Sequence, residues 1–173
     1  PVGERSAQVA NIIYFGQIAP GKGLEFFLET VRLMKRRGIQ CDATVIGAVT
    51  DPREPVYHAA RELAESGDIT LRLNLSEQEV SKCLSDANIA LLPFPGGVSD
   101  KRGSAMASLA HGLGLVTIHS PITPDWMKEI SWHAPTPEVA VSMLSDISIG
   151  AKPLCPAPLR RAEELRLRDW HAI

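Results

Sequence analysis

The chain has 173 residues, enough for one domain with a well-buried core. Its hydrophobic content of 45% and charged content of 22% are ordinary for a globular protein, and a net charge of −2 argues against a general nucleic-acid-binding surface. Aromatic residues make up 5% of the chain, too few to predict a stacking platform for single-stranded nucleic acid. We therefore expect no nucleic-acid partner.

The sequence carries no sign of a membrane or secreted protein. No apolar run is long enough to span a membrane, and the N-terminus lacks the charged-then-apolar pattern of a signal peptide. The three cysteines, Cys41, Cys83 and Cys155, are far apart and match neither a zinc site nor a disulfide framework. These observations predict a cytoplasmic protein without a transmembrane segment.

Strand-like and helix-like patterns alternate along the first two thirds of the chain. In chain order, we expect a strand at 9–15, a helix at 24–37, a strand at 41–46, a helix at 54–65, a strand at 69–73, a helix at 76–84, a strand at 89–92, a helix at 105–111 and a strand at 116–119. Strands that alternate with helices predict βαβ units and a parallel sheet. Right-handed crossovers then place helices on both faces of the sheet, which defines an α/β fold.

The pattern weakens after Pro121. Residues 124–127 indicate a short turn, and residues 138–144 have helical spacing. Residues 151–158 contain three prolines and predict a linker, whereas residues 160–173 predict a charged amphipathic helix. We therefore divide the chain into a domain at 1–150 and a Pro-rich linker with a C-terminal helix at 151–173.

The loop after the buried strand at 89–92 combines prolines, glycines and cations. It reads PFPGGVSDKRGS over residues 93–104 and leads into a helix of small residues. Lys101, Arg102 and the Ser104 hydroxyl thus stand at a helix N-terminus, where free amides and the helix dipole favour an anion. Arginine can grip a phosphate through a fork of donors. The loop predicts a diphosphate site; the alternative is a solvated loop in which serine caps the helix.

The loop at 16–23 nearly matches a P-loop. Gly23 stands where a P-loop has the serine or threonine that binds magnesium, and Pro20 removes one backbone amide. Three interpretations stay open. The loop belongs to a nucleoside triphosphatase, it is a strand-to-helix turn with a solvated lysine, or Gly16 lets the backbone approach a ligand whose phosphate Lys22 reaches.

Both loops follow strands of the same predicted parallel sheet. Ligands of open α/β sheets bind outside the carboxyl ends of the strands, and both loops are expected there. Lys22, Lys101 and Arg102 could therefore converge on one diphosphate.

The ordered series of motifs resembles the C-terminal, donor-binding domain of retaining glycosyltransferases of the GT-B type. The segments that carry the resemblance are IIYFGQIAPGKG at 12–23, DITLRLNLSEQEV at 68–80, DANIALLP at 86–93, AHGLGLVT at 110–117 and RDWHAI at 168–173. The resemblance implies a Rossmann-like open parallel β-sheet with helices on both faces. It also implies binding of a nucleotide-diphosphate sugar, with UDP or GDP as the nucleotide, and an N-terminal acceptor domain that this sequence does not contain.

The resemblance assigns roles to residues of the two loops and their surroundings. The donor-binding residues it implies, together with the loop cations, are Gly16, Gln17, Lys22, Leu75, Ser99, Lys101, Arg102, Gly103 and Ser104. Lys22 and Arg102 are the expected catalytic pair, because preorganised cations stabilise charge that develops on a leaving diphosphate. We expect no metal and no other cofactor. The expected activity is transfer of a hexosyl or similar sugar, for which the chain alone is expected to be insufficient.

Three positions depart from the family pattern. Gln17 stands where the family has arginine, and Ser99 and Ala107 stand where it has two glutamates eight residues apart. The chain resembles a divergent branch with Ser-x-x-Arg-Gly-Ser in this loop, in which Arg102 would supply the charge missing at Gln17. Two alternatives remain: a non-catalytic α/β binding module whose donor site has decayed, and a phosphate-binding domain of another α/β enzyme.

Overall fold

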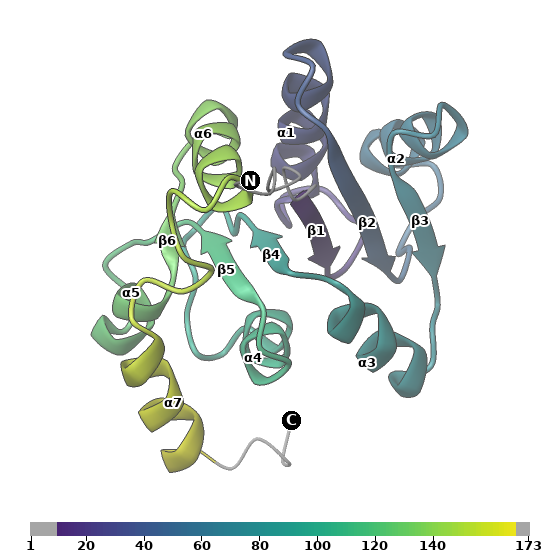
Figure 1. The fold of residues 1–173 in the computed structure, drawn as a ribbon. Helices are drawn as coiled ribbons and strands as arrows, with labels where there is room; N and C mark the ends of the chain where they lie inside the picture. Colours follow the sequence, from purple (N-terminus) through teal and green to yellow (C-terminus); the bar gives the residue numbers. More distant parts are fainter. Residues whose placement is uncertain (1–9, 169–173) are drawn as a thin grey trace.

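The structure is a computed structural model that describes residues 10–168 (Figure 1). Val9 of the first predicted strand and residues 169–173 of the last predicted helix lie outside this range. Within residues 10–168, no helix is both long enough and apolar enough to cross a membrane.

Within residues 10–168, six parallel strands form one open sheet. They are β1 (Ala10–Phe15), β2 (Cys41–Gly47), β3 (Thr70–Leu73), β4 (Ile89–Leu92), β5 (Gly114–Thr117) and β6 (Trp132–His133). The spatial order is β3-β2-β1-β4-β5-β6, and each neighbouring pair is parallel. The chain therefore winds outward from β1 in one direction and from β4 in the other, which confirms the Rossmann-like α/β fold. The point where the order reverses lies between β1 and β4, where open α/β sheets bind ligands.

Helices cover both faces of the sheet (Figure 1). They are α1 (Leu24–Arg36), α2 (Pro55–Glu65), α3 (Glu77–Asp86), α4 (Gly103–Ala110), α5 (Asp125–Ile130), α6 (Pro137–Ser148) and α7 (Pro158–Leu167). Helix α1 packs against both α2 and α6 on one face, while α3 and α4 lie on the other. One face of α1 carries Leu24, Phe27, Leu28, Val31 and Met34, which recur every three or four residues and are buried in the core. All four residues of β4 are buried, as expected for a central strand of a parallel sheet.

The structure differs from the predicted elements around the second loop. Helix α4 begins at Gly103, two residues earlier than predicted, because Arg102 has the extended N-cap conformation (φ −86°, ψ 100°). Strand β5 spans 114–117 rather than 116–119, because its pairing with β4 begins at Gly114 opposite Ile89. Ile118 lies beyond the strand, and its carbonyl accepts a hydrogen bond from the Val98 amide instead (2.8 Å).

Three further differences lie after residue 120. The predicted turn at 124–127 is the first part of α5, for which Pro124 is the N-cap. Strand β6 was not predicted, because two residues are too few to show an alternating pattern. The prediction that the last helix continues through Arg168 is wrong, since Arg168 is extended (φ −108°, ψ 140°) and α7 ends at Leu167.

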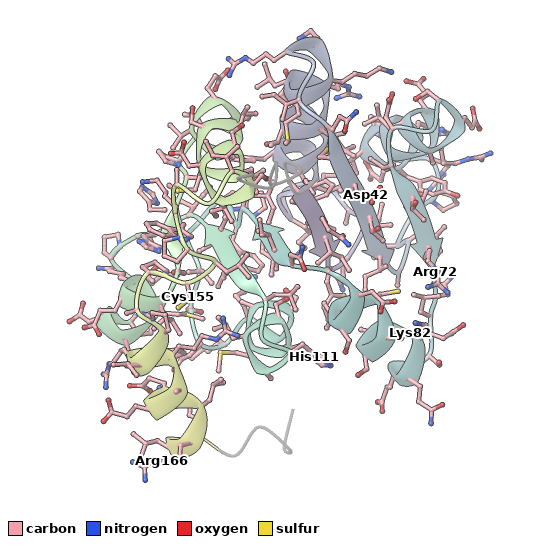
Figure 2. The ribbon with its side chains drawn as sticks, viewed as in Figure 1. Asp42, Arg72, Lys82, His111, Cys155 and Arg166 are labelled. Carbon is pink, nitrogen blue, oxygen red and sulfur yellow. The ribbon has the colours of Figure 1, made fainter. Side chains whose placement is uncertain are left out.

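The Pro-rich segment between α6 and α7 packs on the sheet. Cys155, labelled in Figure 2, is buried, and the Trp132 indole donates a hydrogen bond to the Pro153 carbonyl (3.1 Å). The Leu154 carbonyl lies so close to Gly114 that a Cβ at that position would overlap it. This segment therefore brings α7 against α5, its neighbour in Figure 1.

Candidate functional site

The β1–α1 loop and the β4–α4 loop meet at the carboxyl edge of the sheet. Because β1 and β4 pair directly, the loops that follow them are adjacent. Gly23 marks the contact between them: its φ is +97°, and a Cβ there would overlap the Pro93 carbonyl oxygen. Glycine alone combines that backbone conformation with such a close approach. The end of the first loop is thus held against the start of the second.

A pocket of about 280 Å³ opens between the two loops. Its cationic side chains are Lys22, Lys101 and Arg102, and its other lining residues are Tyr14, Phe15, Gly16, Gln17, Gly21, Phe94, Pro95, Gly103 and Ser104. Seven of the nine predicted donor-binding residues therefore line one pocket. The sequence could only suggest that Lys22, Lys101 and Arg102 are neighbours, and the structure places all three at this pocket.

Two predicted site residues do not line this pocket. Leu75 follows β3 and is half-buried in the connection to α3. Ser99 belongs to the β4–α4 loop, where its carbonyl accepts a hydrogen bond from the Arg102 amide (3.1 Å). The side chain of Ser99 is thus absent from the pocket wall, although its backbone helps to shape the turn that precedes α4.

The positive charges of the pocket are not neutralised by carboxylates. Within residues 10–168, no carboxylate lies within 4.0 Å of the charged nitrogen atoms of Lys22, Lys101 or Arg102. The Arg102 guanidinium lies instead over the Phe94 ring, 5.0 Å from its centre. All three side chains are exposed. The pocket is therefore a concentrated cationic surface in a chain whose net charge is negative.

The N-terminus of α4 adds partial positive charge to this pocket. Arg102 makes no side-chain capping hydrogen bond, and the first turn of α4 contains no acidic residue. By contrast, α3 and α6 are capped by the hydroxyls of Ser76 and Thr136. Ser104 is the second residue of α4 and not its cap, so the predicted alternative of an ordinary serine cap is wrong. The first amides of α4 stay available to an anion.

The β1–α1 loop is held in place from two sides. On one side, the Gly16 amide donates to the Ile46 carbonyl (3.2 Å) and the Ile18 amide to the Ala48 carbonyl (2.9 Å), which ties the loop to the end of β2. On the other side, the buried Tyr14 hydroxyl donates to the Gln17 carbonyl (3.0 Å). Burial, with a smaller contribution from the charge of Glu25, raises the pKa of Tyr14.

Sequence reasoning missed five lining residues, Tyr14, Phe15, Gly21, Phe94 and Pro95. Phe15, Phe94 and Pro95 are apolar, Gly21 has no side chain, and Tyr14 stands in an apolar strand, so none carries a chemical signal by residue type. Tyr14 could have been singled out, because a tyrosine within a buried strand needs a hydrogen-bond acceptor and the next polar backbone belongs to the glycine loop. Among the described residues, no group of three or more His, Cys, Asp or Glu side chains is suited to hold a metal ion.

The sheet order and the pocket at its reversal point define a Rossmann-like domain with a candidate anion site between two strand-to-helix loops. This fold is that of the C-terminal domain of GT-B glycosyltransferases. No protein-family model matches the sequence, and a search of curated proteins finds no significant match.

Three solved structures illustrate the likeness. TarM matches with a TM-score of 0.71 at 11% identity, over 98% of this chain and 34% of its own. The C-terminal domain of the glycosyl transferase group 1 family protein LpcC from Francisella tularensis matches with a TM-score of 0.70 at 14% identity, over 95% of this chain and 93% of its own. The pneumococcal O-GlcNAc transferase GtfA, solved with UDP and GlcNAc, matches with a TM-score of 0.64 at 10% identity, over 92% and 34%. The chain thus spans about a third of the length of TarM and GtfA.

Proposed function

We propose that this chain is the donor-binding domain of a glycosyltransferase and that its pocket binds the diphosphate of a nucleotide sugar. The observation that carries the proposal is the convergence of Lys22, Lys101 and Arg102 on one pocket beside the uncapped N-terminus of α4. A diphosphate is the group that such a set of cations and amides fits best, because both provide donors and positive charge to several oxygens at once. The fold shared with glycosyltransferases supports the same function.

The proposed role of the site is to stabilise the leaving group. As the bond between the anomeric carbon and the diphosphate oxygen breaks, its electron pair goes to that oxygen. The acceptor hydroxyl oxygen bonds to the anomeric carbon, and its proton passes to the leaving diphosphate. Lys22 and Arg102 offset the developing negative charge, assisted by Lys101 and the first amides of α4. We propose that these groups act without a metal ion and that the anomeric configuration is retained. The acceptor would bind to a second domain outside this sequence.

The alternative of a nucleoside triphosphatase is disfavoured by the geometry at Gly23. A P-loop needs a serine or threonine hydroxyl at this position to bind magnesium. Any Cβ here would overlap the Pro93 carbonyl, and the positive φ is strained for side-chain-bearing residues. The magnesium-binding hydroxyl is therefore incompatible with the way the two loops meet.

The alternative of a non-catalytic binding module is favoured by a different observation. None of the residues that line the pocket carries a carboxylate that could hold the hydroxyls of a ribose or a sugar. A decayed site would keep the cationic loops but bind no nucleotide. Measured affinity for nucleoside diphosphates separates the two functions.

The decisive experiment is calorimetric titration of the chain with UDP, GDP and ADP. We expect one of them to bind, and we expect Arg102→Met to weaken that binding about ten- to a hundredfold, as for loss of a charged hydrogen-bond donor. Arg36→Met is the matched control, because Arg36 ends α1 at the opposite edge of the sheet and pairs with Glu29. Equal affinity in the Arg102 variant would remove Arg102 from the site. Binding of none of the three would contradict the donor site and favour the non-catalytic module.

We also propose a cytoplasmic location. The three cysteines are free thiols, which fits a reducing compartment.

A further inference from the structure

Tyr14 lies near the end of β1, against the β1–α1 loop. Its hydroxyl donates to the Gln17 carbonyl (3.0 Å), and the Lys22 carbonyl lies within 3.4 Å of the same oxygen. Gln17 and Lys22 stand near the two ends of the loop, so one hydroxyl contacts both. Tyr14 also lines the pocket that the loop encloses.

Packing of the ring alone does not explain why position 14 carries a tyrosine hydroxyl. The side chain is 2% exposed, and its ring meets the Phe27 ring edge to face, with centres 5.8 Å apart. A phenylalanine would make the same ring contact. A buried hydroxyl is costly unless it is hydrogen-bonded, and the loop carbonyls are what satisfies this one.

No other side chain among residues 10–168 donates a hydrogen bond to a carbonyl of the loop at 16–23. Glu25 also contacts the loop, but as an acceptor: its carboxylate accepts a hydrogen bond from the Gly21 amide (3.2 Å). Among the described side chains, the Tyr14 hydroxyl is therefore the donor that contacts the Lys22 carbonyl. The Lys22 ammonium has no carboxylate within 4.0 Å in the described part of the chain.

We propose that Tyr14 is a positioning residue of the donor site, an inference that rests on the proposed function. Its hydroxyl holds the segment from Gln17 to Lys22 in the conformation that places Lys22 at the pocket. Because folding already orders the loop, a diphosphate does not have to order it on binding. The affinity for the diphosphate is therefore higher by the entropy cost that binding no longer carries. Tyr14 itself need not touch the ligand.

The test is Tyr14→Phe, which removes the hydroxyl and keeps the ring. For the nucleoside diphosphate that the unmodified chain binds, we expect affinity to fall about three- to tenfold, the range for loss of one hydrogen bond. Thr30→Val is the matched control, because Thr30 is fully buried and its hydroxyl donates within α1 to the Phe26 carbonyl (2.8 Å). It should lower stability without changing affinity.

A double-mutant cycle separates positioning from general destabilisation. If Tyr14 acts through Lys22, Tyr14→Phe should weaken binding in the Arg102→Met background but have no effect in the Lys22→Met background. A purely structural role would give the same loss in both backgrounds. Equal losses, or an affinity within twofold of the unmodified chain for Tyr14→Phe alone, would overturn the inference and leave the proposed function standing.

Amide hydrogen exchange tests, without a ligand, whether the Tyr14 hydroxyl orders the loop at 16–23. In Tyr14→Phe we expect faster exchange at the Ile18 and Gly21 amides and unchanged exchange in α6. Unchanged exchange in the loop would overturn the inference whatever the binding result. If the unmodified chain binds none of UDP, GDP and ADP, the proposed function fails, and the Tyr14 inference fails with it.

Discussion

Arg102 and Phe94 hold together the two ends of the β4–α4 loop, with the guanidinium 5.0 Å from the centre of the ring. Phe94 lies two residues after the end of β4 and is only 9% exposed, so most of its surface is packed against the protein. Arg102 is the N-cap of α4 and is exposed. The contact therefore keeps a solvated cation at the mouth of the pocket, where an anion would meet it.

Phe94→Leu should weaken nucleoside diphosphate binding about two- to fivefold. The substitution keeps apolar bulk at the base of the loop but removes the cation–π contact, which is worth about 0.5–1 kcal/mol at an exposed site. Titration calorimetry of both proteins measures the change. Tyr57→Leu is the control, because it removes the comparable contact of Arg61 with Tyr57 on α2 (5.9 Å) outside the pocket lining. If both variants bind as the unmodified chain does, Phe94 does not orient Arg102 for binding.

Gly23→Ala should destabilise the fold more than Gly21→Ala. Both glycines have positive φ, so each alanine costs about 1–2 kcal/mol of backbone strain. At Gly21 the added Cβ meets open space, whereas at Gly23 it overlaps the Pro93 carbonyl and forces the two loops apart. Urea denaturation of the two variants measures the difference, and equal losses of stability would show that the loops do not depend on this contact.

The central part of the fold could be predicted because its pattern is local. Apolar residues recur at helical spacing in α1, and β4 is an uninterrupted apolar run, so both elements are visible without knowledge of their neighbours. The meeting of the two loops was also accessible, since parallel strands bring their carboxyl ends to one edge. Elements that depend on tertiary pairing were missed: β6 has two residues and exists through its pairing with β5.

The cations of the candidate site could be predicted from the sequence, whereas the direction of other side chains could not. Lys22, Lys101 and Arg102 are recognisable by residue type and by their position after a strand. Ser99 precedes Lys101 and Arg102 in the β4–α4 loop, but it does not line the pocket. Tyr14 was not predicted as a site residue, because a tyrosine within an apolar strand is typical of the core. Its role depends on the position of the loop carbonyls that its hydroxyl contacts, which the sequence does not show.

Thr123→Val should destabilise the protein by about 1–3 kcal/mol, the usual cost of losing a buried hydrogen-bonded hydroxyl. Thr123 is 3% exposed, and its hydroxyl donates to the Val98 carbonyl (2.7 Å) and accepts from the Ser120 amide (3.0 Å). It thus links the β4–α4 loop to the segment that follows β5. Thermal or urea unfolding measures the loss. The isosteric control is Thr70→Val on the exposed face of β3, which should change stability by less than about 0.5 kcal/mol. A similar small change at both positions would contradict the structural role of Thr123.

His119→Gln should remove part of the loss of stability in acid. Burial first, and then the nearby charges of His133 and Lys128, lower the pKa of His119 from 6.5 to about 4. The unfolded chain therefore takes up a proton on His119 at higher pH than the folded chain does. The contribution of neutral His119 to the free energy of unfolding is complete above about pH 6.5 and is lost as the pH falls toward 4. Urea unfolding at intervals between pH 7 and pH 4 should give a shallower decline for His119→Gln than for the unmodified chain. Ser131→Ala removes the hydroxyl 2.8 Å from Nε2 of His119 but keeps the imidazole, so it should lower stability while keeping the steep decline. Parallel curves for His119→Gln and the unmodified chain would show that His119 gains its proton equally well in both states.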